Sequence, residues 1–198
     1  MGKLHFVHGC MSASKSSKLI TDRYNFTQNG TNVMVIKPDR DTRVQEPIIF
    51  TRIGISCPCL VRNNLNWKEI LKLEESKSEV YMIDEIHMFK PKDIDSLVVL
   101  ADDYGKLIFT YGLRVDTFQK MFPTVKRLIE VGAKMHELKT NCQIQGCLSH
   151  ATHHLRFRDG QVVKSGPQIK IDDGTDEVFK SVCRRHFNQY FYGRQKTL

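Results

Sequence analysis

Short apolar runs alternate with amphipathic segments along the first two thirds of this sequence. Runs typical of buried strands lie at 4–7, 32–37, 80–83, 106–111 and 135–139. Segments with helical spacing or helix-start signals lie at 16–29, 66–75, 91–103 and 123–134. This alternation predicts an α/β fold, a parallel sheet with helices on both faces.

Three segments between these elements carry other patterns. Residues 47–53 begin with a proline, which predicts an edge strand, and Cys57-Pro58-Cys59 is predicted to be a turn. Metal binding at that turn is disfavoured because the spacing does not match a common zinc pair. The apolar, aromatic loop 112–122 is either the wall of a substrate pocket or a loop packed onto the core.

The segment that follows the first strand has the spacing of a phosphate-binding loop. Gly9 is followed by four residues, the small residue Ser14, and then Lys15 and Ser16 at the start of a helix. In such a loop, backbone N–H groups and the helix dipole bind phosphate, the lysine neutralises charge and the serine hydroxyl binds Mg²⁺. Because Ser14 stands where glycine is usual, it must hold the loop conformation with a Cβ present. The alternative is an ordinary polar turn.

Two carboxylates follow the strand at 80–83. Asp84 ends a buried strand at the sheet edge where open α/β folds bind ligands, and phosphoryl transfer needs an acid beside Mg²⁺ there. Glu85 is placed to take a proton from an attacking hydroxyl. The charged loop 38–43 follows another strand and faces the same edge. The alternative is an exposed acidic turn.

Length and charge narrow the class of protein. The 198 residues suffice for one domain, or one with a small appendage. The net charge of +8 suits an anionic ligand or nucleic acid, but the basic residues are scattered, which favours a solvated surface.

No apolar run approaches the ~20 residues of a membrane span. The N-terminus lacks a signal-peptide pattern, and Phe6 breaks the myristoylation pattern. We therefore expect an intracellular, reducing location, where the six cysteines are thiols or metal ligands.

Four residues near the C-terminus form two close pairs, Cys142 with Cys147 and Cys183 with His186. Two such pairs around a hairpin-sized insert are typical of a structural zinc ribbon. Short strands are predicted in the insert at 152–157, 161–163 and 169–171, with a turn at 159–160. Zinc would supply folding energy that so small a unit cannot obtain from its own core.

The alternative to this zinc site is three free cysteines and a surface histidine. Three other histidines compete as ligands, but a cluster of this kind in a strand is more often exposed, so we leave them outside the metal shell: His150, His153 and His154.

Together these motifs resemble the zinc-containing (type II) class of thymidine kinases over nearly the whole chain. The resemblance rests on residues 8–18, 37–43, 83–85 with Phe89, and 111–122, and on the two Cys/His pairs. Residues 181–187 are particularly similar to the large-phage members. The resemblance implies a P-loop kinase domain at 1–140, a zinc-binding lasso domain at 141–190 and a C-terminal tail at 191–198.

The resemblance also implies an activity, transfer of the γ-phosphoryl group of ATP to the 5′-hydroxyl of thymidine, with deoxyuridine as a further acceptor, in nucleotide salvage and DNA precursor synthesis. The implied cofactors are Mg²⁺ with ATP and structural Zn²⁺. Further implications are feedback inhibition by dTTP, a homotetramer, a cytoplasmic location (the host cytoplasm for a phage protein), and neither a membrane nor a nucleic-acid partner.

Residue by residue, the resemblance makes Glu85 the general base. It assigns ATP and its phosphates to Gly9, Cys10, Met11, Ser12, Ala13, Ser14, Lys15, Ser16, Asp84, Glu85, Ile86 and His87. The Mg²⁺ and phosphate loop would use Ser16, Asp41, Arg43 and Asp84. Under a lasso formed by 148–180, whose backbone hydrogen-bonds to the base, the nucleoside pocket would use Met11, Met88, Leu113, Phe118, Phe122, His154 and Phe179.

Several of these positions depart from the family pattern. Besides Ser14, the departures are His87 for Gln, Met88 for an aromatic residue, Thr117 with Phe118 one residue late, His154 for Thr and Phe179 for Tyr. Losing a hydroxyl partner costs on the order of 1 kcal/mol, which weakens binding without abolishing it. A deoxynucleoside kinase of altered base specificity is therefore one alternative.

Two alternatives belong to other classes. One is a P-loop ATPase that drives a partner, which would need a site that positions water. The other is a zinc-ribbon nucleic-acid binder that uses the positive charge and has no use for Glu85.

Overall fold

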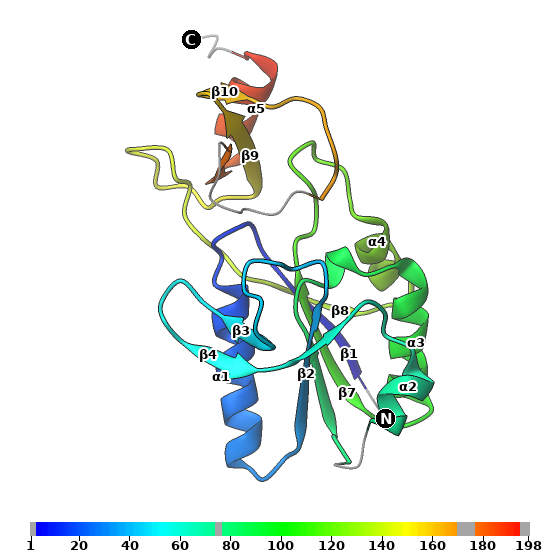
Figure 1. Ribbon diagram of the computed structural model, residues 1–198. Helices are drawn as coiled ribbons and strands as arrows, with labels where there is room; N and C mark the ends of the chain where they lie inside the picture. Colours follow the sequence, from blue (N-terminus) through cyan, green and yellow to red (C-terminus); the bar gives the residue numbers. More distant parts are fainter. Residues whose placement is uncertain (1–2, 74–76, 170–176, 195–198) are drawn as a thin grey trace.

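A parallel sheet forms the centre of the molecule, and a smaller antiparallel sheet lies beyond one end of it (Figure 1). The computed structural model describes residues 3–73, 77–169 and 177–194. The large sheet has six strands in the order β5-β2-β6-β7-β1-β8, and every neighbouring pair is parallel. Its strands are β1 (Lys3–His8), β2 (Val33–Pro38), β5 (Leu60–Arg62), β6 (Val80–Ile83), β7 (Leu107–Gly112) and β8 (Lys134–Glu137).

The inner strands are the apolar runs that the sequence predicted. All four residues of β6 are buried, as expected of a central parallel strand covered on both faces. Successive residues point to opposite faces, so Phe6 and Val7 of β1 belong to different core clusters. The predicted parallel α/β fold is confirmed.

Helices cover the two faces unequally (Figure 1). On one side, α1 (Lys15–Gln28) buries Leu19 against Val7 and Met82. The other face carries α2 (Trp67–Lys72), α3 (Pro91–Asp102) and α4 (Pro123–Glu130). A 3-10 turn, η1 (Ile86–Met88), follows β6.

One predicted helix boundary changes, and one predicted helix cap is confirmed. The helix expected at 123–134 ends at Glu130, because Gly132 turns the chain at φ 75°. In α2, the predicted cap is confirmed, since Asn66 accepts hydrogen bonds from the backbone N–H groups of Lys68 and Glu69.

A strand does form within residues 47–53, but it belongs to a small separate sheet and not to the edge of the large one. Within them, β3 (Ile48–Phe50) pairs with β4 (Ser56–Pro58) in a separate antiparallel hairpin. Cys57-Pro58-Cys59 is thus not a turn, since its first two residues belong to β4. The edge place is taken by β5, whose three residues were too short an apolar run to predict a strand.

The small sheet has three antiparallel strands in the order β10-β9-β11, packed against α5 (Arg184–Tyr192). Its strands are β9 (His153–Arg158), β10 (Gln161–Val162) and β11 (Glu177–Val182). We call this unit the ribbon. The strand expected at 169–171 lies mostly outside the described residues. The sequence analysis did not predict α5. This helix ends at Tyr192, two residues inside the segment 191–198 that was expected to be a tail.

Among the described residues, we find no helix long and apolar enough to cross a membrane.

The buried carboxylate of Asp93 tests how this fold is held. Its oxygens accept hydrogen bonds from the backbone N–H groups of Leu65 and Lys90, which joins the loop before α2 to the start of α3. We expect Asp93→Ala to lower the free energy of unfolding by about 3 kcal/mol, because it removes a helix cap and leaves the Leu65 N–H buried without a partner. Urea unfolding measures this change.

The control is Asp102→Ala, at an exposed position on the same helix. This variant should change the free energy of unfolding by no more than about 0.5 kcal/mol. Equal losses in the two variants would contradict the role given to Asp93.

Candidate active site

The phosphate-binding loop runs from the end of β1 to the start of α1. Gly9 has no room for a side chain, since a Cβ there would lie 2.7 Å from both the Ala13 Cβ and the Leu138 carbonyl oxygen. Ser12 and Ser14 both adopt left-handed backbone conformations, with φ of 60° and 56°. The expectation that Ser14 holds a glycine-like conformation is therefore confirmed.

Lys15 lies buried within this loop. Its ammonium donates to the carbonyl oxygens of Cys10, at 2.8 Å, and Gly9, at 3.4 Å. Burial lowers the pKa of Lys15 below its usual value, although the charges of Glu85 and Asp84 oppose that shift. A lysine ammonium held by two loop carbonyl oxygens at the start of a helix is positioned to bind an anion.

Asp84 and Glu85 lie side by side at the end of β6. Asp84 is 2 % exposed and accepts hydrogen bonds from the Ser16 hydroxyl, at 3.1 Å, and from the backbone N–H of Glu85. Glu85 has a left-handed backbone, with φ of 46°. One of its oxygens, Oε1, accepts a 2.6 Å hydrogen bond from the Arg43 guanidinium.

The two carboxyl groups have opposite pKa shifts. Burial and the neighbouring Glu85 charge raise the pKa of Asp84 to about 7. Burial is the largest single influence on the pKa of Glu85 and acts to raise it, but the charges of Arg43, His87 and Lys15 and the Arg43 hydrogen bond together outweigh it, and the pKa falls to about 2. Glu85 therefore stays ionised. Asp84 is the carboxyl group whose charged form would gain most from an additional cation nearby.

The loop after β2 delivers Arg43 to this pair. Its guanidinium also binds both carboxylate oxygens of Asp41, at 2.7 and 2.8 Å. The buried ammonium of Lys37 donates to the carbonyl oxygens of Val44, Glu46 and Ile48, which anchors the loop. The charged loop that the sequence predicted near the phosphates is thus tied to Glu85.

The second oxygen of Glu85, Oε2, has no hydrogen-bond partner. The His87 Nδ1 lies 3.5 Å from it, but this nitrogen accepts a hydrogen bond from the Leu113 N–H and so carries no proton. Burial lowers the pKa of His87 to about 4, which keeps the ring neutral. Glu85 Oε2 is therefore free to accept a proton from a ligand.

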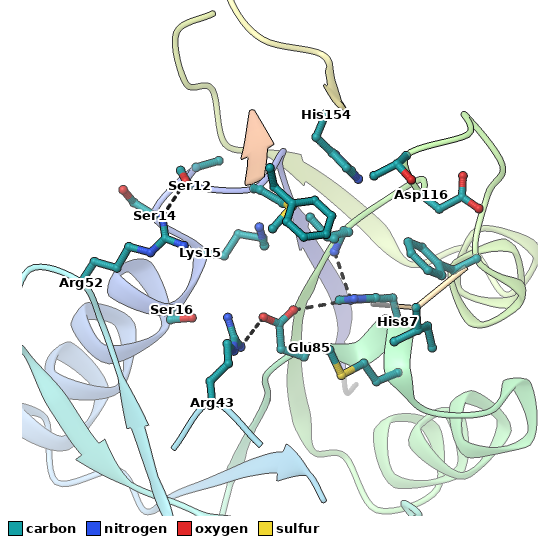
Figure 2. A pocket seen from close by; sticks show the side chains of 18 of the residues that line it. Ser12, Ser14, Lys15, Ser16, Arg43, Arg52, Glu85, His87, Asp116 and His154 are labelled. Carbon is teal, nitrogen blue, oxygen red and sulfur yellow. Dashed lines mark hydrogen bonds and ion pairs between the residues drawn. The ribbon is translucent and has the colours of Figure 1, made fainter. Parts of the chain in front are cut away.

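These groups open into a cavity of about 380 Å³ between the large sheet and the ribbon (Figure 2). A volume of this size suits a small-molecule ligand. Among the residues that the sequence assigned to ATP or nucleoside, the lining includes Met11, Ser12, Ala13, Ser14, Lys15, Ser16, Arg43, Glu85, His87, Met88, Leu113, Phe122, His154 and Phe179.

Other assigned residues do not line this cavity. Gly9 and Cys10, at the start of the loop, line a separate small cavity, and Asp41, Asp84 and Ile86 are buried behind the lining. Phe118 was expected to line the pocket, but the neighbouring residue Thr117 lines the cavity in its place. The reason is local, since Asp116 Oδ1 accepts the N–H groups of both Phe118 and Lys120 and turns the loop there.

Sequence reasoning missed several lining residues. The β3–β4 hairpin supplies Phe50, Thr51, Arg52 and Ile53, and the ribbon supplies Arg156. Figure 2 shows Arg52 reaching the phosphate loop, where Nη1 lies 3.5 Å from the Ser12 Oγ. No motif marks these residues, because the cavity gathers them from separate segments.

The three flanking histidines do not behave alike. His150 is exposed as expected, and His153 is half-buried. His154 is only 3 % exposed and enters the cavity, so its expected exposure was wrong while its assignment to the pocket agrees with the structure.

The two Cys/His pairs converge at the base of the ribbon. The ligand atoms of Cys142, Cys147, Cys183 and His186 all lie within 4.8 Å of one another. Individual separations are 3.3 Å from the Cys142 Sγ and 3.5 Å from the Cys183 Sγ to the His186 Nδ1, and 4.0 Å between the Cys147 and Cys183 sulfurs. A tetrahedral zinc with bonds of about 2.1–2.3 Å needs ligand atoms about 3.4–3.8 Å apart. The cluster can therefore hold a zinc ion.

One hydrogen bond joins the ribbon to the phosphate loop. The Ser181 hydroxyl, on β11, donates to the Met11 carbonyl oxygen, and the Ser181 N–H donates to the Gln143 side chain beside Cys142. Through Ser181, the segment that carries the metal ligand Cys142 is thus hydrogen-bonded to β11, and β11 is hydrogen-bonded to the phosphate loop.

Comparison with known proteins matches residues 2–187 to the family model described as thymidine kinase. A thymidine kinase of Enterobacteria phage T4 is 32% identical over 193 residues, which cover 96% of this chain and 97% of the phage protein. Thymidine kinases of Rhodopirellula baltica and Legionella pneumophila (strain Lens) are 30% and 31% identical. Those alignments cover 98% and 96% of this chain, and 92% and 90% of the relatives.

Ser14→Gly tests the strain in the phosphate loop. We expect this substitution to raise the free energy of unfolding by about 0.5–1 kcal/mol, because glycine adopts a φ of 56° without the steric penalty of a Cβ. Chemical denaturation measures the difference. As a control, Ser17→Gly introduces the same change inside α1 and should cost about 0.5 kcal/mol. A loss in both variants would show that Ser14 is not strained.

Removal of metal tests the zinc site. We expect the protein as purified to hold one zinc per chain, and a strong chelator to lower its melting temperature until zinc is restored. Cys183→Ser should lose the metal. Cys59→Ser, which alters a buried thiol in another part of the fold, should keep it. Zinc content by atomic absorption decides, and an unchanged melting temperature after complete chelation would reject a structural metal.

Proposed function

The chain belongs to the thymidine kinase family, and we propose that it carries out the reaction of that family, the transfer of the γ-phosphoryl group of ATP to the 5′-hydroxyl of thymidine. The observation that supports this most directly is Glu85, with one carboxylate oxygen held by Arg43 and the other unpartnered toward the cavity. Such a carboxylate sits between a phosphate loop and an apolar pocket, where a nucleoside hydroxyl would meet ATP.

The phosphate end of the cavity binds the donor. The N-terminus of α1 and the loop N–H groups receive the phosphate oxygens, and the Lys15 ammonium neutralises charge on them. The Ser16 hydroxyl and the Asp84 carboxylate suit Mg²⁺, which prefers oxygen ligands, and the charge of a cation there would lower the pKa of Asp84, against burial and the Glu85 charge, which raise it. When bound, Mg²⁺ would stabilise charge on the transferred group.

The opposite end binds the acceptor. Apolar side chains suited to the faces of a base line this part of the cavity: Met88, Leu113, Phe122 and Phe179. The 5′-hydroxyl then points at Glu85 and donates its hydrogen to Oε2. As the oxygen bonds to the γ-phosphorus, its proton passes to Glu85 and the bond to the bridging oxygen breaks, leaving ADP.

Neighbouring residues keep Glu85 in this role. Arg43 keeps the carboxylate ionised and fixes its orientation through Oε1. The neutral ring of His87 lies beside Oε2 without donating to it, because its near nitrogen is already an acceptor.

Further properties follow from family membership alone. We propose that the chain works as a cytoplasmic homotetramer in nucleotide salvage, is inhibited by dTTP, accepts deoxyuridine besides thymidine, and does not act on nucleic acid. In this proposal, the kinase domain ends near residue 140 and the zinc-binding domain closes over the base.

The decisive experiment compares wild type with Glu85→Gln. Phosphoryl transfer from labelled ATP with Mg²⁺ is measured for thymidine, deoxyuridine, deoxycytidine and deoxyguanosine. We expect labelled thymidine monophosphate from the wild type and a loss of kcat of at least about 10²-fold in the variant, because the hydroxyl proton loses its acceptor. Glu130→Gln, at an exposed site on α4, should behave as wild type.

The other outcomes identify the alternatives. Transfer to deoxycytidine or deoxyguanosine alone would indicate a kinase of altered base specificity. Hydrolysis of ATP without transfer to any nucleoside would indicate an ATPase, and salt-sensitive DNA binding without kinase activity would indicate a nucleic-acid binder.

A further inference from the structure

Lys37 is a buried lysine near the end of β2, outside the lining of the cavity. It is 2 % exposed, and alternation along the strand places it on the same face as Val35, which packs with Ile49 and Cys57 of the β3–β4 hairpin. A charged ammonium in such apolar surroundings is costly unless it has hydrogen-bond acceptors. The partners of Lys37 therefore indicate its role.

These partners are three carbonyl oxygens of one short segment. The Lys37 ammonium donates to the carbonyl oxygens of Val44, Glu46 and Ile48, at 2.8, 2.9 and 3.1 Å. An ammonium has three N–H donors, so this set can use all of them. Because the acceptors belong to alternate residues, the segment 44–48 is bound to Lys37 at both ends and in the middle.

Arg43 directly precedes this segment, and its side chain is not held by the core. The Arg43 side chain is 40 % exposed, whereas the side chains of its two partners, Asp41 and Glu85, are 8 % and 10 % exposed. Residues 41–47 contain neither helix nor strand. Fixing an irregular segment costs conformational entropy, which the hydrogen bonds from Lys37 offset. The place of Arg43 thus depends on the loop, and the loop depends on Lys37.

Arg43 in turn holds the carboxylate at the reaction centre. Its guanidinium binds Glu85 Oε1 at 2.6 Å, which leaves Oε2 for the substrate (Figure 2). Without the Lys37 ammonium, the three carbonyl oxygens lose their donor, and the segment moves to where water replaces it. Arg43 moves with the segment. A shift of about 1 Å at a reacting group can lower a rate about 10²-fold.

We propose that Lys37 is a positioning residue for phosphoryl transfer, whose ammonium fixes the loop that carries Arg43, so that Arg43 fixes the carboxylate that accepts the substrate proton. This rests on the proposed function and extends it to a residue that touches neither substrate. Lys37 then acts only through Arg43, and its loss should affect turnover more than the binding of thymidine.

The same argument predicts a change in the pH dependence of turnover. Burial acts to raise the pKa of Glu85, and Asp84 lies beside it. Three groups from separate elements act to lower that pKa: Arg43, His87 and Lys15. If Arg43 moves away, the pKa of Glu85 rises. Since Glu85 must be ionised to accept a proton, turnover is then lost at a higher pH as the solution is acidified.

Lys37→Met tests the proposal, because it removes all three donors from a side chain of similar length. The matched control is Lys106→Met. The Lys106 ammonium also donates to a backbone carbonyl, that of Ser78 at 2.8 Å, but at the opposite end of the sheet. For both variants, and for Arg43→Met with and without Lys37→Met, kcat and the KM for thymidine are measured between about pH 5 and 8. Thermal unfolding shows which variants are folded.

We expect Lys37→Met to lower kcat at least about 10-fold and to leave the KM for thymidine within about 3-fold of wild type. Its kcat relative to wild type should fall further toward about pH 5. In the Arg43→Met protein, adding Lys37→Met should change kcat less than about 2-fold, because the two residues act in series. Lys106→Met should be less stable but should keep the wild-type kcat at every pH.

If Lys37→Met does not fold, Lys37→Gln takes its place in every comparison. Its amide keeps two N–H donors at a shorter reach, so the loop loses only part of its anchoring. We then expect a smaller fall in kcat, about 3-fold or more, with the same dependence on pH and on Arg43.

Three results would overturn the inference and leave the kinase assignment intact. They are a wild-type kcat in the folded Lys37 variant, a ratio to wild type that stays constant across the pH range, and an undiminished loss in the Arg43→Met background. An equal fall of kcat in Lys106→Met would show that turnover follows stability, which also overturns it. If the wild type phosphorylates no nucleoside, the proposed function itself fails, and the role of Lys37 fails with it.

Discussion

Burial of two adjacent carboxylates at the end of β6 is the constraint on which the site depends. Neither Asp84 nor Glu85 can stay charged there without partners, because a desolvated charge is costly. The partners come from separate elements, with Ser16 from α1 and Arg43 from the loop after β2. Satisfying this pair therefore draws together the start of α1, the end of β6 and the charged loop, which are the parts that phosphoryl transfer needs.

The ribbon forms part of the cavity wall. None of its four Cys/His residues lines the cavity, yet the strands between them supply His154 and Phe179. The register of β9 and β11 decides which side chains face inward, and the Ser181 hydroxyl ties the same sheet to the phosphate loop. A metal that stabilises this register would shape the base-binding end without touching substrate.

Patterns that are local in sequence were predictable. The central strands are continuous apolar runs, and Gly9 to Ser16 and the Cys/His pairs have characteristic spacings. Features that depend on contacts between distant parts of the chain could not be predicted from these patterns. A three-residue strand such as β5 carries too little pattern, and the burial of His154 depends on the register of a strand that pairs with residues over twenty positions away. The place of Thr117 depends on the hydrogen bonds of Asp116, which apolar spacing does not reveal.

The two histidines in the cavity preserve its electrostatics although they depart from the family pattern. Each stands where an uncharged side chain is usual, and a charged imidazolium at either place would add to Lys15 and Arg43. Burial prevents this by lowering the pKa of His87 to about 4 and that of His154 to about 3. Both rings thus act near neutral pH as uncharged hydrogen-bonding groups, so the substitutions change the shape and hydrogen-bonding pattern around the nucleoside but not the charge that Glu85 experiences.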